Sequence, residues 1–149
     1  MSGITVPVRP GAAVVPLPSM SPDAVANVGR FEAALRQCPQ ATLHTEHAFH
    51  AGIYTRTIKL PAGVALAGVT IKIPTVLIVS GDVLTYGDNG TTRLTGYHVT
   101  LGQPGRKQAF VALSDTWMTM MFATGAQDVD AAERQFTDEF ENLGSRREK

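Results

Sequence analysis

The sequence of 149 residues contains very little cysteine and no excess of charge of either sign. Cys38 is the only cysteine, so an internal disulfide is excluded and a reducing compartment is the simplest expectation. Lysine plus arginine and aspartate plus glutamate number 13 each, which gives a formal net charge of zero. Neutralising phosphates requires a basic excess, so we expect no nucleic-acid partner. A low net charge also removes one barrier to self-association.

Long apolar runs and familiar catalytic motifs are absent as well. No stretch reaches the roughly 18 apolar residues of a membrane-spanning helix, so we expect no membrane partner. Four prolines interrupt the first twenty residues, a pattern that does not fit a signal peptide. The chain has no nucleophile elbow, no phosphate-binding loop and no paired-cysteine metal knuckle.

The length fits one domain preceded by a proline-rich segment. Proline fixes φ and removes a backbone donor, so residues 1–20 are expected to be extended. The segment is also more apolar than disordered tails usually are. We predict an arm over 1–20 that lies against a neighbouring subunit or the parent domain, and a single domain over 21–149. The expected contact residues of the arm are Ile4, Val6, Val8, Val14, Val15 and Leu17.

Two segments of the domain carry helical signals. Ser21 suits an N-cap, and apolar residues then recur at steps of three and four until Pro39. A second segment begins at a capping Asp128 and has the same spacing over four turns. These patterns predict helices over about 21–37 and 128–143.

The region between residues 42 and 124 changes to short runs of β-branched and aromatic residues separated by turn residues. Gly81-Asp82 and the segment 87–90 read as turns, the second as a strong hairpin signal. Seven or eight strands at this spacing predict a mainly β sandwich, jelly roll or barrel. The runs are 53–60, 64–73, 76–80, 83–86, 91–94, 97–101, 109–114 and 116–123.

The last of these runs is apolar on both faces. Trp117, Thr119 and Met121 point one way, and methionine and phenylalanine side chains point the other. The run is therefore expected to be buried on both sides, as a central core strand or with the Trp117 face against another subunit.

Residues 58–123 resemble the cupin superfamily. The Pro61–Gly63 corner looks like the lead-in to the first cupin motif, the 76–83 segment like the turn that closes it, and the 102–105 segment like the corner of the second motif. Glycines at such places permit the positive φ of tight reversals. The resemblance implies a cupin-like jelly roll.

The usual cupin metal ligands are missing from this pattern. Metal cupins carry two histidines and a glutamate in the first motif and a histidine in the second, and these positions fall near Lys72, Pro74, Leu77 and Lys107 or Gln108. None of these is a good ligand at neutral pH. We therefore expect no metal, no cofactor and no enzymatic activity.

From His47 to Thr124 the order of the pieces resembles small cupin-like proteins of tailed bacteriophages. The similar pieces are 47–56, 60–63, 104–107 and 112–116, followed by an acidic helix rich in phenylalanine. The resemblance implies a phage protein. Our first hypothesis is a non-enzymatic virion structural protein, either a capsid decoration (cement) subunit or a tail-associated subunit, found in the virion and in the host cytoplasm during assembly. It would act as a dimer or trimer and through arm contacts with virion proteins such as the major capsid protein.

Three further groups of residues are candidates for binding. Tyr54 and Arg56 share a strand face, and with Tyr97 they suggest a second hypothesis, a carbohydrate or small-ligand site at the barrel mouth. Arg106 and Lys107 form a basic turn that could engage a carboxylate of a neighbouring subunit.

The third group is the only local cluster with metal-ligand chemistry, and it is the basis of a third hypothesis, an atypical metal-dependent enzyme. On a strand, His44, Glu46 and His50 would share a face, whereas on a helix His47 and His50 would lie one turn apart. The alternative is that these histidines make hydrogen bonds at the entry to the sheet.

Overall fold

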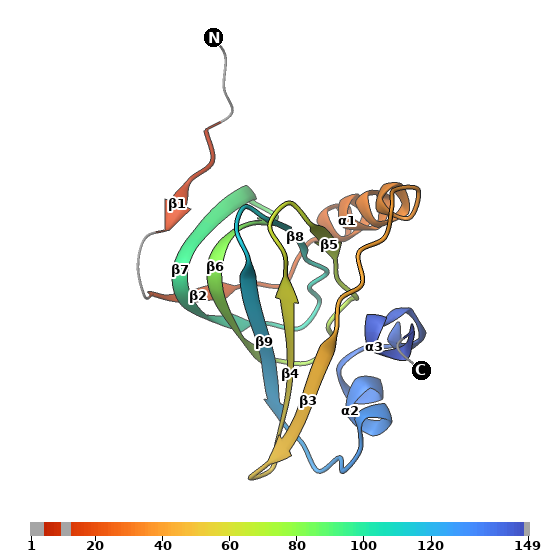
Figure 1. The fold of residues 1–149 in the computed structure, drawn as a ribbon. Coiled ribbons are helices and arrows are strands. Elements are labelled where there is room, and N and C mark those ends of the chain that lie inside the picture. Colours follow the sequence, from red (N-terminus) through yellow and green to blue (C-terminus); the bar gives the residue numbers. More distant parts are fainter. Residues whose placement is uncertain (1–4, 10–12, 148–149) are drawn as a thin grey trace.

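The computed structural model describes residues 5–9 and 13–147. Ile4, one of the expected arm contacts, lies outside the described residues. The fold class predicted from the sequence, mainly β with helices near both ends, is confirmed (Figure 1). No helix in the described part of the chain is long and apolar enough to cross a membrane. The elements are β1 (Val8–Arg9), β2 (Ala13–Leu17), α1 (Pro22–Leu35), β3 (Thr45–His50), β4 (Ile53–Leu60), β5 (Ala65–Ala67), β6 (Thr75–Gly87), β7 (Gly90–Gly102), β8 (Ala109–Ala112), β9 (Thr116–Ala123), α2 (Val129–Phe136), the 3₁₀ turn η1 (Phe140–Asn142) and α3 (Gly144–Arg147).

The long hairpin of β6 and β7 is the frame of the fold. Its register runs from Thr75 opposite Gly102 to Gly87 opposite Gly90, which confirms the predicted hairpin turn at 87–90. The first half of β6 pairs with β9, and the second half pairs with β8. Each half of the hairpin therefore belongs to a different layer, and the curved ribbons of β6 and β7 join the two layers in Figure 1.

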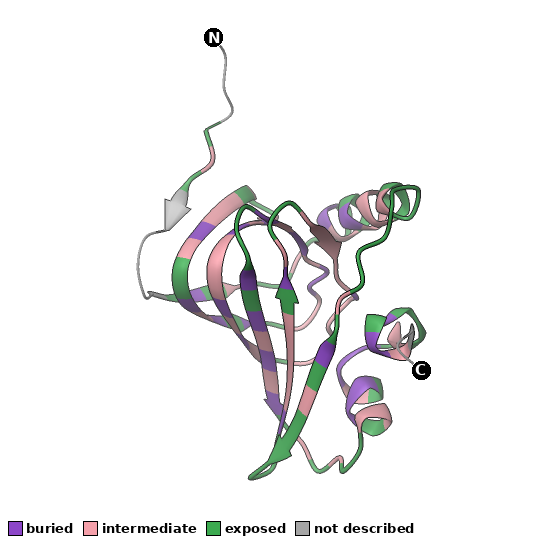
Figure 2. Cartoon of the chain, viewed as in Figure 1, coloured by how far each residue is buried: buried purple, intermediate pink, exposed green. Residues whose placement is uncertain are grey.

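Two layers enclose the core. The first, which we call the long sheet, has the order β2, β7, β6, β9, β4 and β3. The second, the short sheet, consists of β5, β8 and the far halves of β6 and β7, with β1 added to β7. Burial alternates along β9 (Figure 2), so one face of the long sheet lines the core and the other faces outward.

The hairpin bends where two glycines are paired, Gly81 on β6 and Gly96 on β7. Both have a positive φ, of +152° and +88°. A Cβ on Gly81 would lie 2.4–2.8 Å from atoms of Thr116, so no larger residue fits at this close approach. The sequence predicted a turn at Gly81-Asp82, and this was wrong, because the strand bends there and continues into the other layer.

The N-terminal segment is part of the chain's own sheet. Strand β2 pairs in parallel with β7, with Val15 opposite Thr100. Val15 is buried, and Leu17 packs against the core, so these two residues contact the parent domain, which was one of the two alternatives for the arm. Val14 points outward and is exposed, and its expected interface role stays a prediction, as do those of Val6 and Val8.

The two predicted helices had different outcomes. Helix α1 begins after the predicted cap, where the Ser21 side chain accepts a hydrogen bond from Ala24 N at 3.1 Å. The second helix was predicted over 128–143 but ends at Phe136, so its last two turns were wrong. Thr137 is extended there, and its hydroxyl donates to Thr70 O at 2.6 Å. Bonds to a segment far away in the sequence replace those that would have continued the helix.

Candidate functional site

A cavity of about 750 Å³ lies between the two sheets. Its floor is apolar and is made from both layers, by side chains that point inward from five strands. At the other side, the end of α1, the segment 36–42 that follows it and residues 142–144 line the cavity. Ligand pockets typically measure about 300–1,000 Å³, so this cavity is large enough for a small organic molecule. The floor includes Ile58, Leu66, Leu77, Phe110, Met118 and Met120.

Charged side chains on the cavity wall are few. Among the residues that line it, Glu32, Arg36, Arg56 and Arg106 are charged. Arg36 lies 3.7 Å from Glu32 in an ion pair near the mouth. The wall therefore has three cations and one anion, a balance that disfavours a cationic ligand.

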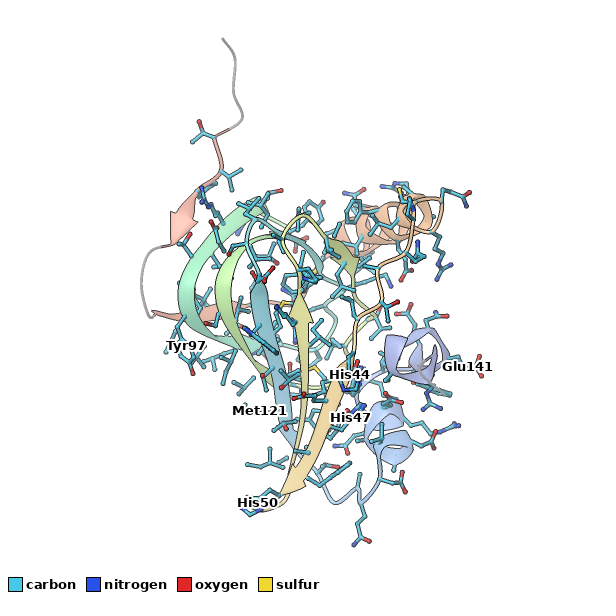
Figure 3. The ribbon with its side chains drawn as sticks, in the orientation of Figure 1. His44, His47, His50, Tyr97, Met121 and Glu141 are labelled. Carbon is cyan, nitrogen blue, oxygen red and sulfur yellow. The ribbon has the colours of Figure 1, made fainter. Side chains whose placement is uncertain are left out.

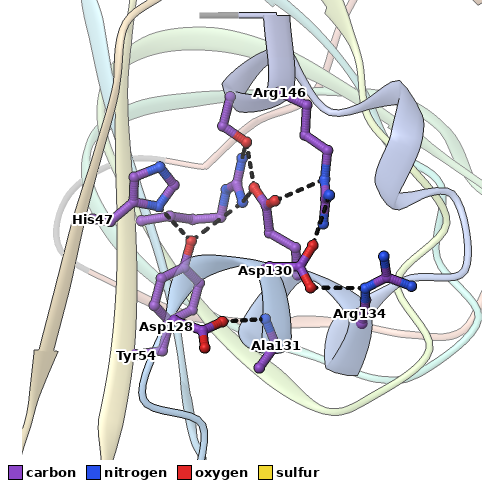
Figure 4. A network of polar contacts seen from close by, with 10 residues as sticks. His47, Tyr54, Asp128, Asp130, Ala131, Arg134 and Arg146 are labelled. Atoms are coloured by element: carbon purple, nitrogen blue, oxygen red, sulfur yellow. Dashed lines mark hydrogen bonds and ion pairs between the residues drawn. The ribbon is translucent and has the colours of Figure 1, made fainter. Parts of the chain in front are cut away.

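Arg56 belongs to a buried network between β4 and the C-terminal helices (Figure 4). Its Nη1 lies 3.2 Å from a carboxylate oxygen of Glu133, which is only 1% exposed, and 3.3 Å from the hydroxyl of Tyr54. The guanidinium also lies 5.2 Å from the centre of the Phe136 ring. Glu133 accepts a further hydrogen bond from Ser145. The charge of Arg56 is thus neutralised within the chain.

Tyr54 extends this network to β3. Its hydroxyl lies 2.6 Å from Nδ1 of His47, and it is fully buried. Burial raises the pKa of Tyr54, while the nearby Arg56 acts to lower it. Arg146 completes the arrangement, with its Nε 3.0 Å from the second oxygen of Glu133. The network therefore fixes α2 and α3 against the strands beside the cavity.

Arg106 stands in a different environment. It is 1% exposed, and the structure places no acidic group within ion-pair distance of it among the described residues. Its guanidinium donates to the Thr75 hydroxyl at 2.7 Å, to the Gln103 carbonyl and to the Gln108 side chain at 3.4 Å. Burial lowers the pKa of Arg106 to about 10, so the group is still charged at neutral pH.

The expected interface role of Arg106 and Lys107 needs correction. Both side chains are buried in the chain itself, Lys107 at 4% exposure, and neither is available to a neighbouring subunit. Lys107 Nζ lies 3.1 Å from Glu139 and 3.5 Å from Glu32. Burial acts to raise the pKa of Glu139, but hydrogen bonds from Thr70 and Lys107 outweigh it and the pKa is lowered. The carboxylates expected from another subunit are supplied by this chain.

The histidine cluster does not come together. His44 precedes β3 and His50 ends it, and Figure 3 shows them at opposite ends of the strand. Glu46 is exposed, whereas His47 alternates to the inner side and contacts Tyr54. The described residues contain no group of three histidine, cysteine, aspartate or glutamate side chains that could hold a metal ion. His44, Glu46, His47 and His50 therefore do not form the site on which the third hypothesis was based.

The expected ligand-binding trio is divided between two faces. Tyr54 and Arg56 lie on the inner face of β4, as their spacing predicted, and Arg56 lines the cavity. Tyr97 lies on β7 and is 48% exposed (Figure 3). It does not line the cavity. Tyr97 is therefore removed from the candidate site.

Sequence reasoning missed most of the cavity wall. Leu77 was considered only as a vacant metal-ligand position, and Met118 and Met120 only as one face of the last strand. Alternation along β9 assigned the two methionines to one face, but the distance between the sheets is not a local property of the chain. Glu133 was missed as well, because no local pattern separates a buried acid on a helix from an exposed one.

No model of a known protein family matches the chain, and no curated protein matches it. Solved structures that are similar to it include a cupin superfamily protein from Desulfitobacterium hafniense, at 13% identity and a TM-score of 0.48, covering 62% of this chain and 86% of that one. KdgF from a Halomonas species is similar at 13% identity and a TM-score of 0.49, covering 62% and 87%. A cupin-2 domain protein from Shewanella frigidimarina is similar at 12% identity and a TM-score of 0.44, covering 62% and 91%. Similarities this distant identify neither a family nor an activity, and the phage assignment stays a prediction.

Proposed function

We propose that this protein binds a small, predominantly apolar molecule in the cavity between its two sheets. The observation that supports the proposal is the cavity itself, with about 750 Å³ of space and a floor of aliphatic, aromatic and methionine side chains. Apolar lining with a few polar groups is the usual composition of small-molecule sites. Methionine side chains also adapt to ligands of different shapes.

The proposal is tested by replacing a residue of β6 with a larger side chain that fills the cavity. Leu77 points into it, and Ile78, the next residue of β6, points outward on the opposite face. Leu77→Trp should therefore weaken binding of the uncharged dye Nile red at least tenfold, whereas the matched Ile78→Trp should leave it unchanged. Both are measured by fluorescence titration after circular dichroism has confirmed folding, with Met118→Phe as the second variant. Absence of saturable binding to the wild-type protein would refute the proposal, and so would equal binding by the filled variants.

A second candidate function is assembly through the outer face of the long sheet. Rows of outward residues cross the sheet, for example Leu101 beside Val76 and then Met121. Trp117 is 50% exposed on this face, so the last strand is not a core strand buried on both sides within the single chain. The alternative, in which the Trp117 face meets another subunit, stays a prediction. The nearest charged group in its row, Lys59, is already paired with Asp115 at 3.2 Å. A face without free charge at its centre suits a second copy of itself.

This second function is tested by light scattering after size-exclusion chromatography. Trp117→Glu together with Leu101→Glu should convert a dimer into a monomer. Leu113→Glu, at an equally exposed leucine outside the sheet, should leave the dimer intact. A monomeric wild-type protein at micromolar concentration would exclude the assembly.

The narrower virion role is tested by the copy number of this protein in purified phage particles, where its absence would refute it.

A further inference from the structure

The single unneutralised cation on the described cavity wall is the starting point of the inference, which rests on the proposed ligand-binding function. Arg36 and Glu32 pair with each other, and Arg56 pairs with Glu133. Arg106 is the remaining charged residue of the wall, and Glu32 and Glu139, which pair with the neighbouring Lys107, are not within ion-pair distance of it. A molecule that fills the cavity therefore meets a net positive charge at this point of the wall.

The guanidinium of Arg106 is held in a fixed position. A Cβ on Gly102 would lie 2.3–2.5 Å from its terminal carbon and nitrogens, so the flat group lies directly against this glycine. The bond from Nη2 to the Thr75 hydroxyl fixes one side, and the Gln103 carbonyl fixes the other. Arginine has five N–H donors, and three hydrogen bonds use three of them. The other two donors have no acceptor among the described residues.

The energetics favour an anion at this place. A buried charge without a counter-charge is costly, and a carboxylate that accepts two N–H bonds from one guanidinium provides both charge and geometry. The burial that lowers the pKa of Arg106 would be offset by such a partner. The neutral partners Thr75, Gln103 and Gln108 satisfy hydrogen bonds but leave the charge in place.

We propose that Arg106 binds the carboxylate of an amphipathic ligand whose apolar body lies on the cavity floor formed by Leu77, Met118 and Met120. The ligand class is an aliphatic or aromatic monocarboxylate. A carboxylate placed at Arg106 faces no acid of the wall, because Glu32 is engaged by Arg36 and Lys107.

The test compares three ligands with the same apolar chain and different head groups: decanoate, 1-decanol and decylamine. Isothermal titration of the wild-type protein should give decanoate the tightest binding, at least tenfold tighter than 1-decanol, with decylamine the weakest. This comparison needs no variant. Equal binding of decanoate and 1-decanol would overturn the role of Arg106 while leaving the proposed function standing. No binding of any of the three would overturn both.

A variant set locates the effect. Arg106→Met should abolish the preference for decanoate over 1-decanol, and Arg106→Lys, which keeps the charge but loses the fork, should retain part of it. Arg134→Met is the matched control, because Arg134 does not line the cavity and is paired with Asp130. A preference that survives Arg106→Met in a folded protein, or that is lost in Arg134→Met, would overturn the proposal. If Arg106→Met does not fold, the result with Arg106→Lys decides.

Discussion

Two arginines on the cavity wall have opposite surroundings. Beside α2 and α3, Arg56 has a buried carboxylate as its partner, and its guanidinium also donates to the Tyr54 hydroxyl. Arg106 is more deeply buried and has only neutral partners. The first arginine has a structural task, since its partner Glu133 belongs to the C-terminal segment. Arg56 and Arg106 are both largely buried, so burial alone does not identify a binding group. In our proposal the missing counter-charge of Arg106 does.

The largest effect, on stability, is expected at Glu133, the partner of Arg56. Glu133→Gln should destabilise the protein by about 3–5 kcal/mol, because it leaves Arg56 and Arg146 without their buried partner. Urea unfolding followed by circular dichroism measures this change in the free energy of unfolding. The control is Asp138→Asn, which breaks an exposed pair with Lys72 outside this network and should cost under about 1 kcal/mol. Equal losses in the free energy of unfolding for the two variants would contradict the structural role of the Arg56–Glu133 pair.

The next effect concerns the position of Arg106. Gly102→Ala places a methyl group within 2.5 Å of the guanidinium and should displace it. We expect a loss of about 1–3 kcal/mol in stability and a reduced preference for decanoate over 1-decanol. Gly125→Ala is the matched control, because nothing lies within 4 Å of its added methyl and its φ is not positive. Unchanged ligand preference in Gly102→Ala would argue against a fixed guanidinium.

A smaller effect is expected from the neutral partner of Arg106. Thr75→Val removes the hydroxyl that accepts its hydrogen bond while keeping the shape of the side chain. The free energy of unfolding should fall by about 1–3 kcal/mol, toward the lower end, because other acceptors remain. Denaturant unfolding gives the stability, and a titration with decanoate gives the affinity. A bound carboxylate can take up the freed N–H, so decanoate should stabilise this variant more than it stabilises the wild type. A smaller stabilisation would count against the site.

The smallest effect is a dependence of decanoate affinity on pH. Arg106 must be protonated to bind an anion, and its pKa is lowered to about 10. Affinity for decanoate should therefore be constant from pH 7 to 9 and fall as the pH rises through about 10. Affinity for uncharged 1-decanol should not follow this change over the same range. A parallel decline of both ligands would indicate loss of structure at high pH and not titration of Arg106.

Much of the fold was readable from local sequence signals. Ser21 and the residues after it predicted α1 because capping and helical spacing act within a few residues. The boundaries of β4 and β9, at 53–60 and 116–123, agree with the predicted runs. What failed depends on distant contacts. Gly81 looked like a turn because its pairing with Gly96 is not visible locally, and Thr137 ends α2 through a bond to a segment far away.

The candidate site was less predictable than the fold. Tyr54 and Arg56 were expected on one face, and the structure has them in one network. Arg106 and Lys107 were expected at a subunit interface, because a basic pair after a Pro-Gly corner has the pattern of a solvated turn. Their burial results from the way the loop folds onto Thr75 and onto Glu139, residues more than thirty positions away. Charge pairing in the interior is set by tertiary structure, so the sequence did not reveal which arginine lacks an acid.

The most direct test of the account is a crystal structure of the protein with 10-bromodecanoate. If Arg106 binds the carboxylate, the anomalous signal of bromine will lie within the cavity between the two sheets, and the carboxylate will lie within hydrogen-bond distance of Arg106. A ligand bound on the outer face of the long sheet, or one whose carboxylate points to solvent at the cavity mouth, would contradict it.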